Sequence, residues 1–173
     1  PPAAGAAPAG AAAPAAAAAA PPQQSSSPDA SAQKTALAQR AFVRGMQFFK
    51  EGEFDKARPF FEAAIQNDPV NEPHYHHKYA ICLSRAKGGF TKAVDAALKA
   101  CEMDVYNLEF KLTLGEIYEN AGVPTKAQQV YEDVLKWDPD NTKAKNKLKF
   151  VIEANRKVGF LEKHMPSLFG KKG

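Results

Sequence analysis

Three histidines in one short stretch are the residues of this chain whose type and spacing could do chemistry. His74, His76 and His77 lie within four positions of one another, and imidazole nitrogens are frequent ligands of zinc. On a helix, His74 and His77 would share a face because they are three residues apart. A third ligand is missing, since neither Lys78 nor Cys82 supplies one in a usable geometry. We therefore predict no metal and no cofactor, and expect these histidines to begin a helix that faces a groove.

The remaining reactive side chains do not form a catalytic constellation. Cys82 and Cys101 have no CxxC or metal-ligand spacing, so we expect them to be buried, reduced thiols within helices. Asp138 and Asp140 flank a proline, which turn and helix-cap chemistry explains. No nucleophile motif or glycine-rich phosphate loop occurs in the sequence. We predict a non-enzymatic protein, and the reduced cysteines favour a cytoplasmic location.

A regular spacing of small, aromatic and turn residues organises the chain instead. Between residues 108 and 139 this skeleton consists of Leu114, Gly115, Tyr118, Gly122, Ala127, Tyr131 and Pro139. Seventy residues earlier it returns as Gly45, Phe48, Gly52, Ala57, Phe61 and Pro69. The pattern is typical of two antiparallel helices pressed close together: small residues let the backbones approach, rings fill the space beside them, and proline ends the second helix.

This skeleton resembles the tetratricopeptide repeat (TPR), apart from Lys111 where tryptophan is usual. The resemblance covers about residues 36–158 and implies an all-α fold, a right-handed α-α superhelix. We expect three helix-turn-helix repeats, at about residues 38–71, 73–106 and 108–141. A capping helix over 142–158 follows, with a cap offered by residues 140–142.

The second repeat is irregular and has two possible frames. Ala93 lies 36 residues after Ala57, whereas Ala127 lies 34 residues after Ala93. We place Ala80 at the close-contact position, because the other frame would put Ile81 there and its branched side chain would hold the helices apart.

Both ends of the chain differ in composition from the repeats. Residues 1–35 are rich in alanine and proline and contain no large apolar side chain, so we expect a disordered linker. The chain does not begin with methionine, which suggests a preceding domain that this linker tethers. The net charge is +7 over residues 141–173 and −3 over the rest of the chain, which together give its total of +4. A basic end of this kind favours a solvated capping helix over a nucleic-acid surface.

The last residues leave two interpretations open. We expect Gly159 to end the capping helix, so that a basic tail over 159–173 follows and either folds back or docks a partner. No apolar run approaches the length of a membrane span.

The resemblance also implies a binding surface. In TPR proteins the first helices of successive repeats line a concave groove that holds a peptide or helix of a partner protein. Counting from the close-contact residues, the groove-facing places on the repeats are Phe42, Met46, Phe49, His77, Ile81, Ser84, Leu112, Glu116 and Glu119, and the capping helix continues the line with Asn146, Phe150 and Glu153. They form an apolar stripe with an acidic border, which favours an amphipathic helix or hydrophobic peptide as partner. The alternative is that Phe42, Phe49 and Leu112 are covered by neighbouring helices.

Three functions are compatible with these features. The first is a tethered protein-interaction module that uses the apolar groove. The second is a chaperone accessory, because the chain also resembles the C-terminal TPR segments of bacterial multidomain proteins, including J-domain proteins. The third is a structural part that packs against another subunit. TPR proteins that grip acidic chaperone tails place basic and amide side chains in the groove, and here only Lys78 could serve.

Overall fold

The computed structural model describes residues 28–70, 72–86 and 89–164, and of Pro28 and residues 158–164 it describes the backbone only. These residues form seven helices and no strand, as predicted for an all-α chain. The helices are α1 (Pro28–Lys50), α2 (Phe54–Gln66), α3 (Pro73–Arg85), α4 (Phe90–Met103), α5 (Leu108–Asn120), α6 (Pro124–Trp137) and α7 (Thr142–His164). Within the described residues, none of them is long and apolar enough to cross a membrane.

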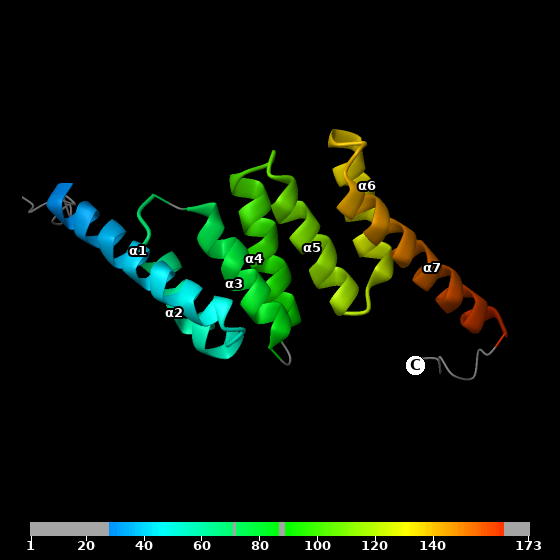
Figure 1. Ribbon diagram of the computed structural model, residues 1–173, viewed down its shortest axis with the longest axis horizontal. Helices are drawn as coiled ribbons and strands as arrows, with labels where there is room; N and C mark the ends of the chain where they lie inside the picture. Colours follow the sequence, from blue (N-terminus) through cyan, green and yellow to red (C-terminus); the bar gives the residue numbers. More distant parts are fainter. Residues whose placement is uncertain (1–27, 71, 87–88, 165–173) are drawn as a thin grey trace, which may run out of the picture.

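The helices stand in a row from α1 to α7 (Figure 1), as three antiparallel pairs followed by α7. The first helices of the pairs contact one another directly. The ring of Phe42 on α1 lies 4.7 Å from the ring of Tyr75 on α3, measured between centroids. The imidazole of His77 on α3 is in turn hydrogen-bonded to Thr113 on α5. One layer therefore consists of α1, α3 and α5, and their partners α2, α4 and α6 pack behind it.

Glycine residues, which have no side chain, allow the two helices of a pair to approach closely. A Cβ atom added to Gly115 of α5 would overlap the ring of Tyr131 on α6, with the ring Cζ only 2.8 Å away. The corresponding Cβ at Gly45 of α1 would lie 2.9 Å from the ring of Phe61 on α2. Both rings are completely buried. The small residue and the ring thus form one packing unit in each of these repeats, as the skeleton predicted.

The irregular second repeat follows the predicted frame. Ala80 of α3 is completely buried, whereas the neighbouring Ile81 is half-buried. Ala93 of α4, the partner position on the second helix, is also completely buried. The close contact in this pair is therefore made by two alanines rather than by glycine and an aromatic ring.

Glycine also makes the turns inside the first and third repeats. Gly52 and Gly122 have φ angles of 77° and 71°, a left-handed conformation that glycine adopts without steric cost. After each glycine, the next amide donates a hydrogen bond of 2.9 Å to the carbonyl five residues back. This arrangement satisfies carbonyls that the end of a helix would leave unpaired.

The predicted linker extended too far. Helix α1 begins at Pro28, eight residues before the predicted start of the folded domain, so residues 28–35 are helical. Proline suits the first position of a helix, and Asp29 in the first turn interacts favourably with the helix dipole. The hydroxyl of Thr35 adds a bond of 3.1 Å to the carbonyl of Ser31. The rest of the predicted linker lies outside the described residues.

The predicted end of the capping helix was also wrong. Asn141 caps α7 as expected, its side chain accepting a bond of 2.9 Å from the amide of Ala144. The helix then continues through Gly159 to His164. A single glycine costs a helix only about 1 kcal/mol relative to alanine, and no proline follows until Pro166. Residues 165–173, most of the predicted tail, lie outside the described residues.

Candidate functional site

His77 is part of the packing between α3 and α5 and not of an open surface. Its side chain is 1 % exposed, its Nε2 atom lies 2.8 Å from Oγ1 of Thr113, and its ring lies 4.7 Å from that of Phe110. The prediction that His77 faces a groove was therefore wrong. Its neighbour His74 is exposed, with its ring edge-on to Phe110. Among the described residues, no three His, Cys, Asp or Glu side chains come together as a metal site.

Burial determines the chemistry of His77 and of the two thiols. Burial lowers the pKa of His77 to about 4, helped by the nearby charge of Lys78, so the imidazole is neutral at physiological pH. Burial raises the pKa of Cys82 to about 12 and that of Cys101 to about 11. Because the thiolate is the nucleophilic form, these cysteines are weak nucleophiles at neutral pH.

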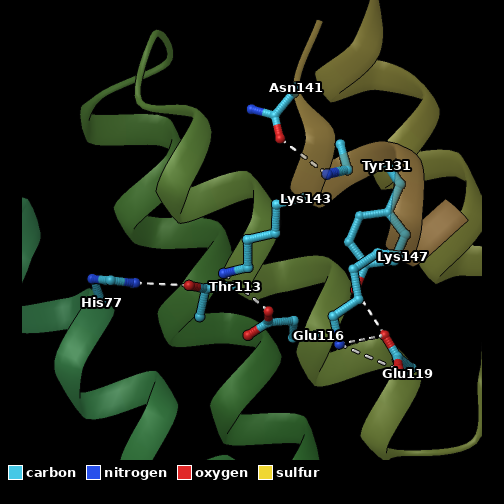
Figure 2. A network of polar contacts seen from close by, with 9 residues as sticks. His77, Thr113, Glu116, Glu119, Tyr131, Asn141, Lys143 and Lys147 are labelled. Atoms are coloured by element: carbon cyan, nitrogen blue, oxygen red, sulfur yellow. Dashed lines mark hydrogen bonds and ion pairs between the residues drawn. The ribbon is translucent and has the colours of Figure 1, made fainter. Parts of the chain in front are cut away.

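Two ion pairs join α5 to α7 (Figure 2). Lys143 lies 3.1 Å from Glu116, and Lys147 lies 3.2 Å from Glu119. The hydroxyl of Tyr131, which stems from α6, donates a further bond of 3.0 Å to Glu119. The acidic border predicted for the groove is thus neutralised by lysines of the last helix. Glu116, one of the predicted groove residues, is engaged within the chain.

The Glu119–Lys147 pair provides the first prediction. Both side chains are largely shielded from solvent, and Glu119 is also held by Tyr131. A double-mutant cycle of Glu119→Gln and Lys147→Met should give a coupling free energy of about 1 kcal/mol in urea unfolding. The exposed pair Lys99–Glu102 is the matched control and should give about 0.3 kcal/mol. Equal couplings would contradict a structural role for the α5–α7 pair.

The inner face of α1 is aromatic and only half-buried. The rings of Phe42 and Phe49 both pack against the buried Phe61, at centroid distances of 5.6 Å and 6.1 Å. Lys78 of α3 places its Nζ atom 5.5 Å above the ring of Phe49. Neighbouring helices therefore cover part of each ring, as the alternative interpretation held, and part of each remains accessible.

The other predicted groove residues differ in exposure. Met46 and Ile81 are half-buried, like the phenylalanines of α1. Leu112 is 6 % exposed and belongs to the main core, so its prediction as a contact residue was wrong. Phe150 of α7 is 62 % exposed. It lies three residues after Lys147 and therefore on the same face of α7 that turns toward α5.

Comparison with known families identifies the repeat. Residues 108–141 match the family model of the tetratricopeptide repeat. The chain carries a TPR repeat. This segment begins with α5, includes α6 and ends at the Asn141 that caps α7, and thus contains the packing unit of Gly115 and Tyr131.

Solved TPR domains have the fold of the whole repeat region. The first TPR domain of Spaghetti (RPAP3), bound to the HSP90 peptide SRMEEVD, is 23 % identical, with a TM-score of 0.62 over 70 % of this chain and 98 % of that one. The second TPR domain of human RPAP3, in complex with the HSP70 peptide SGPTIEEVD, is 20 % identical, with a TM-score of 0.59 over 70 % and 97 %. These matches show the TPR fold.

A curated relative is similar in sequence. Stress-induced-phosphoprotein 1 of Caenorhabditis elegans is 30 % identical over 112 residues, which are 65 % of this chain and 34 % of that protein. The chain thus spans about a third of the length of this relative. The likeness is between one TPR region and part of a longer protein.

Proposed function

We propose that this TPR domain is a non-enzymatic module that binds an amphipathic helix or hydrophobic peptide of a partner protein on its inner face. The observation that carries the proposal is the apolar stripe on α1 and α3, formed by the half-buried Phe42, Met46, Phe49 and Ile81. The first three have the spacing i, i+4 and i+7 and so lie on one side of α1. Peptide helices are recognised in this way, by apolar anchors that meet an apolar surface.

The stripe is suited to binding because its rings are already held in place. Phe49 packs against Phe54 at 5.3 Å and lies under Lys78, and Phe42 rests on Tyr75. Side chains that are ordered before binding lose little conformational freedom on association, which favours affinity. Phe150 adds an exposed aromatic side chain on α7, at the far end of the same face, where it would contact the end of a bound helix.

A second candidate is an acidic peptide like those bound by the solved TPR domains of RPAP3. Lysines on the inner face favour it, because carboxylates pair with ammonium groups. However, Lys143 and Lys147 are already paired with Glu116 and Glu119, which leaves Lys78 as the available cation of this group. The apolar stripe therefore favours a hydrophobic partner. Preferential binding of an acidic peptide would instead indicate the role of a chaperone accessory.

The proposal extends to the location of the domain and to its link with a further domain. The reduced Cys82 and Cys101 suit the cytoplasm. Residues 1–27, rich in alanine and proline, would serve as a tether to a further domain. Such a tether would raise the effective concentration of the bound partner near that domain.

Two fluorescent peptides test the proposal by anisotropy: a neutral helical peptide of leucine and glutamine with one apolar face, and SRMEEVD. We expect the neutral helix to bind. The double variant Met46→Gln/Phe150→Ser should reduce the affinity for this helix at least about tenfold, which corresponds to a loss of roughly 1.4 kcal/mol of binding free energy. The control is Leu98→Ser, which removes a partly exposed leucine from α4 and should change nothing.

The two candidates predict different results. Binding of SRMEEVD in preference to the neutral helix, together with its loss in Lys78→Ala, would replace our proposal by chaperone-tail recognition. Failure of both peptides to bind, with the helical content of the protein intact, would leave the third function, permanent packing against a subunit.

A further inference from the structure

The outer side of α7 is a second surface, which no other helix covers in the part of the chain that the structure describes. Helix α7 packs on α6 with one side and pairs with α5 through its lysines. Between α6 and α7 lies a groove of about 360 Å³ that we call the end groove. Its floor consists of Leu135, Leu148 and Ile152. Leu135 and Leu148 are half-buried and pack against the main core, whereas Ile152 is 45 % exposed.

The rim of the end groove is basic. Lys145, Lys149 and Arg156 line it, against one acidic side chain, Glu153. Lys149 and Arg156 form no ion pair with any side chain that the structure describes. Lys145 lies 3.2 Å from Asp140, whose side chain is fully exposed, so solvent screens that pair strongly. Four lysines of α7 thus fall into two groups. Lys143 and Lys147 are paired with the acids of α5, whereas Lys145 and Lys149 line the end groove, where only the screened pair with Asp140 opposes their charge.

From this arrangement we propose that the end groove docks an acidic amphipathic helix of a partner protein. Leucine-like side chains of the partner would cover Leu148 and Ile152, and its carboxylates would meet Lys149 and Arg156. The rim cations are four and seven residues apart along α7, and Ile152 lies between the last two. Charge and apolar contact are therefore offered along one stripe of the helix, which matches the two faces of an amphipathic helix.

Charge argues against a second copy of this chain as the occupant. At the opposite end of the row, a hollow on the free side of α1 is lined by Arg40, Val43 and Arg44. Stacking the two ends head to tail would bring these arginines against Lys149 and Arg156. A contact between two α7 helices would oppose the same cations. Like charges facing each other across an interface disfavour both arrangements.

The chain's own last residues and a membrane surface are less suitable occupants of the end groove than an acidic helix. Residues 165–173 contain Lys171 and Lys172 and no acidic residue, so they would add positive charge to a positive rim. An anionic bilayer attracts basic helices that project large apolar side chains from their surface. Here Leu135 and Leu148 form the floor of a groove between two helices, which a convex partner fills and a flat surface does not.

The end groove is separate from the stripe on the inner face. Ile152 and Lys149 lie on the side of α7 opposite to Phe150 and Lys147, because two residues correspond to about half a turn of an α-helix. The end-groove proposal therefore does not depend on the proposed function, and variants of one surface should leave the other intact.

The test uses two helical peptides, one with a leucine face and a glutamate face and one with lysine in place of each glutamate. We expect the glutamate peptide to bind the protein saturably and the lysine peptide not to bind. The double variant Lys149→Glu/Arg156→Glu should bind the glutamate peptide at least tenfold more weakly and should gain binding of the lysine peptide. Chemical-shift changes on binding should centre on residues 145–156 and Leu135.

Matched controls separate the end groove from general electrostatics. Arg40→Glu/Arg44→Glu makes the same change of charge at the other basic hollow and should leave binding unchanged, as should Phe150→Ser on the inner face. Equal weakening by both charge reversals, or no saturable binding, would overturn the proposal. It would also be overturned if phosphatidylserine vesicles or a single-stranded oligonucleotide bound with the same dependence on Lys149 and Arg156 while the peptide did not.

Discussion

Gly115→Ala is expected to destabilise the domain by about 2 kcal/mol, although alanine is the better helix former by about 1 kcal/mol. The new methyl group would overlap the ring of Tyr131. This ring is completely buried and its hydroxyl is bonded to Glu119, so moving it aside costs free energy. Either the ring moves and breaks that bond, or α5 and α6 separate. Urea unfolding followed by circular dichroism measures the effect.

Gly45→Ala is the matched control, because it makes the same change at the same place in the first repeat. Here the added methyl would lie 2.9 Å from the Phe61 ring, a smaller overlap, and this ring carries no hydroxyl that a hydrogen bond holds in place. The gain in helix propensity should offset most of the strain, leaving a change of at most about 0.5 kcal/mol. If both variants lose the same stability, the close packing of Gly115 against Tyr131 does not have the importance that we give it.

Acidification should destabilise the domain through His77 by about 3 kcal/mol between pH 6.5 and pH 4. The pKa of this imidazole falls from 6.5 to about 4 on folding. Between these values the unfolded chain binds a proton that the folded chain does not, so lowering the pH favours unfolding. Above pH 6.5 both states are neutral at this position and the effect vanishes. The free energy of unfolding, measured by urea denaturation at several pH values, shows the slope.

His77→Gln supplies the control for this prediction. Glutamine can keep a hydrogen bond to Thr113 but does not titrate, so the pH dependence between 6.5 and 4 should flatten. The pKa of His76 is also lowered, mainly by burial, so His76→Gln should remove a second part of the slope. An unchanged slope in His77→Gln would show that its imidazole can become charged within the folded protein.

Much of the fold could be predicted because local spacing encodes it. The turn glycines that precede α2 and α6, the buried alanines and the rings beside them recur at the same intervals in the first and third repeats. Even the irregular repeat could be aligned, since only Ala80 allows the close approach. The two ends were harder to predict. Helix α1 extends back to Pro28 and α7 extends past Gly159 because a helix, once formed, propagates through residues that are merely tolerated.

The candidate site could be predicted only in part. The spacing predicted that Phe42, Met46, Phe49 and Ile81 face the groove, and these side chains are half-buried; their contact with a partner stays a prediction. It could not show that His77 would be buried with Thr113, because the partner lies on another repeat. The lysines of α7 looked alike in the sequence, yet two of them neutralise Glu116 and Glu119.

By itself, the sequence determined that this chain forms helical pairs with a close contact in each, because these features depend on residues within one repeat. The tertiary structure decided which side chains remain available to a partner. Exposure and charge at a position depend on the neighbouring helix: α5 buries His77 of α3, and α7 neutralises the acids of α5. On α7 itself, no further helix covers the side that carries Ile152 and Lys149 in the described part of the chain. The side chains that this side of α7 offers to a partner can therefore be read from the sequence of α7 itself.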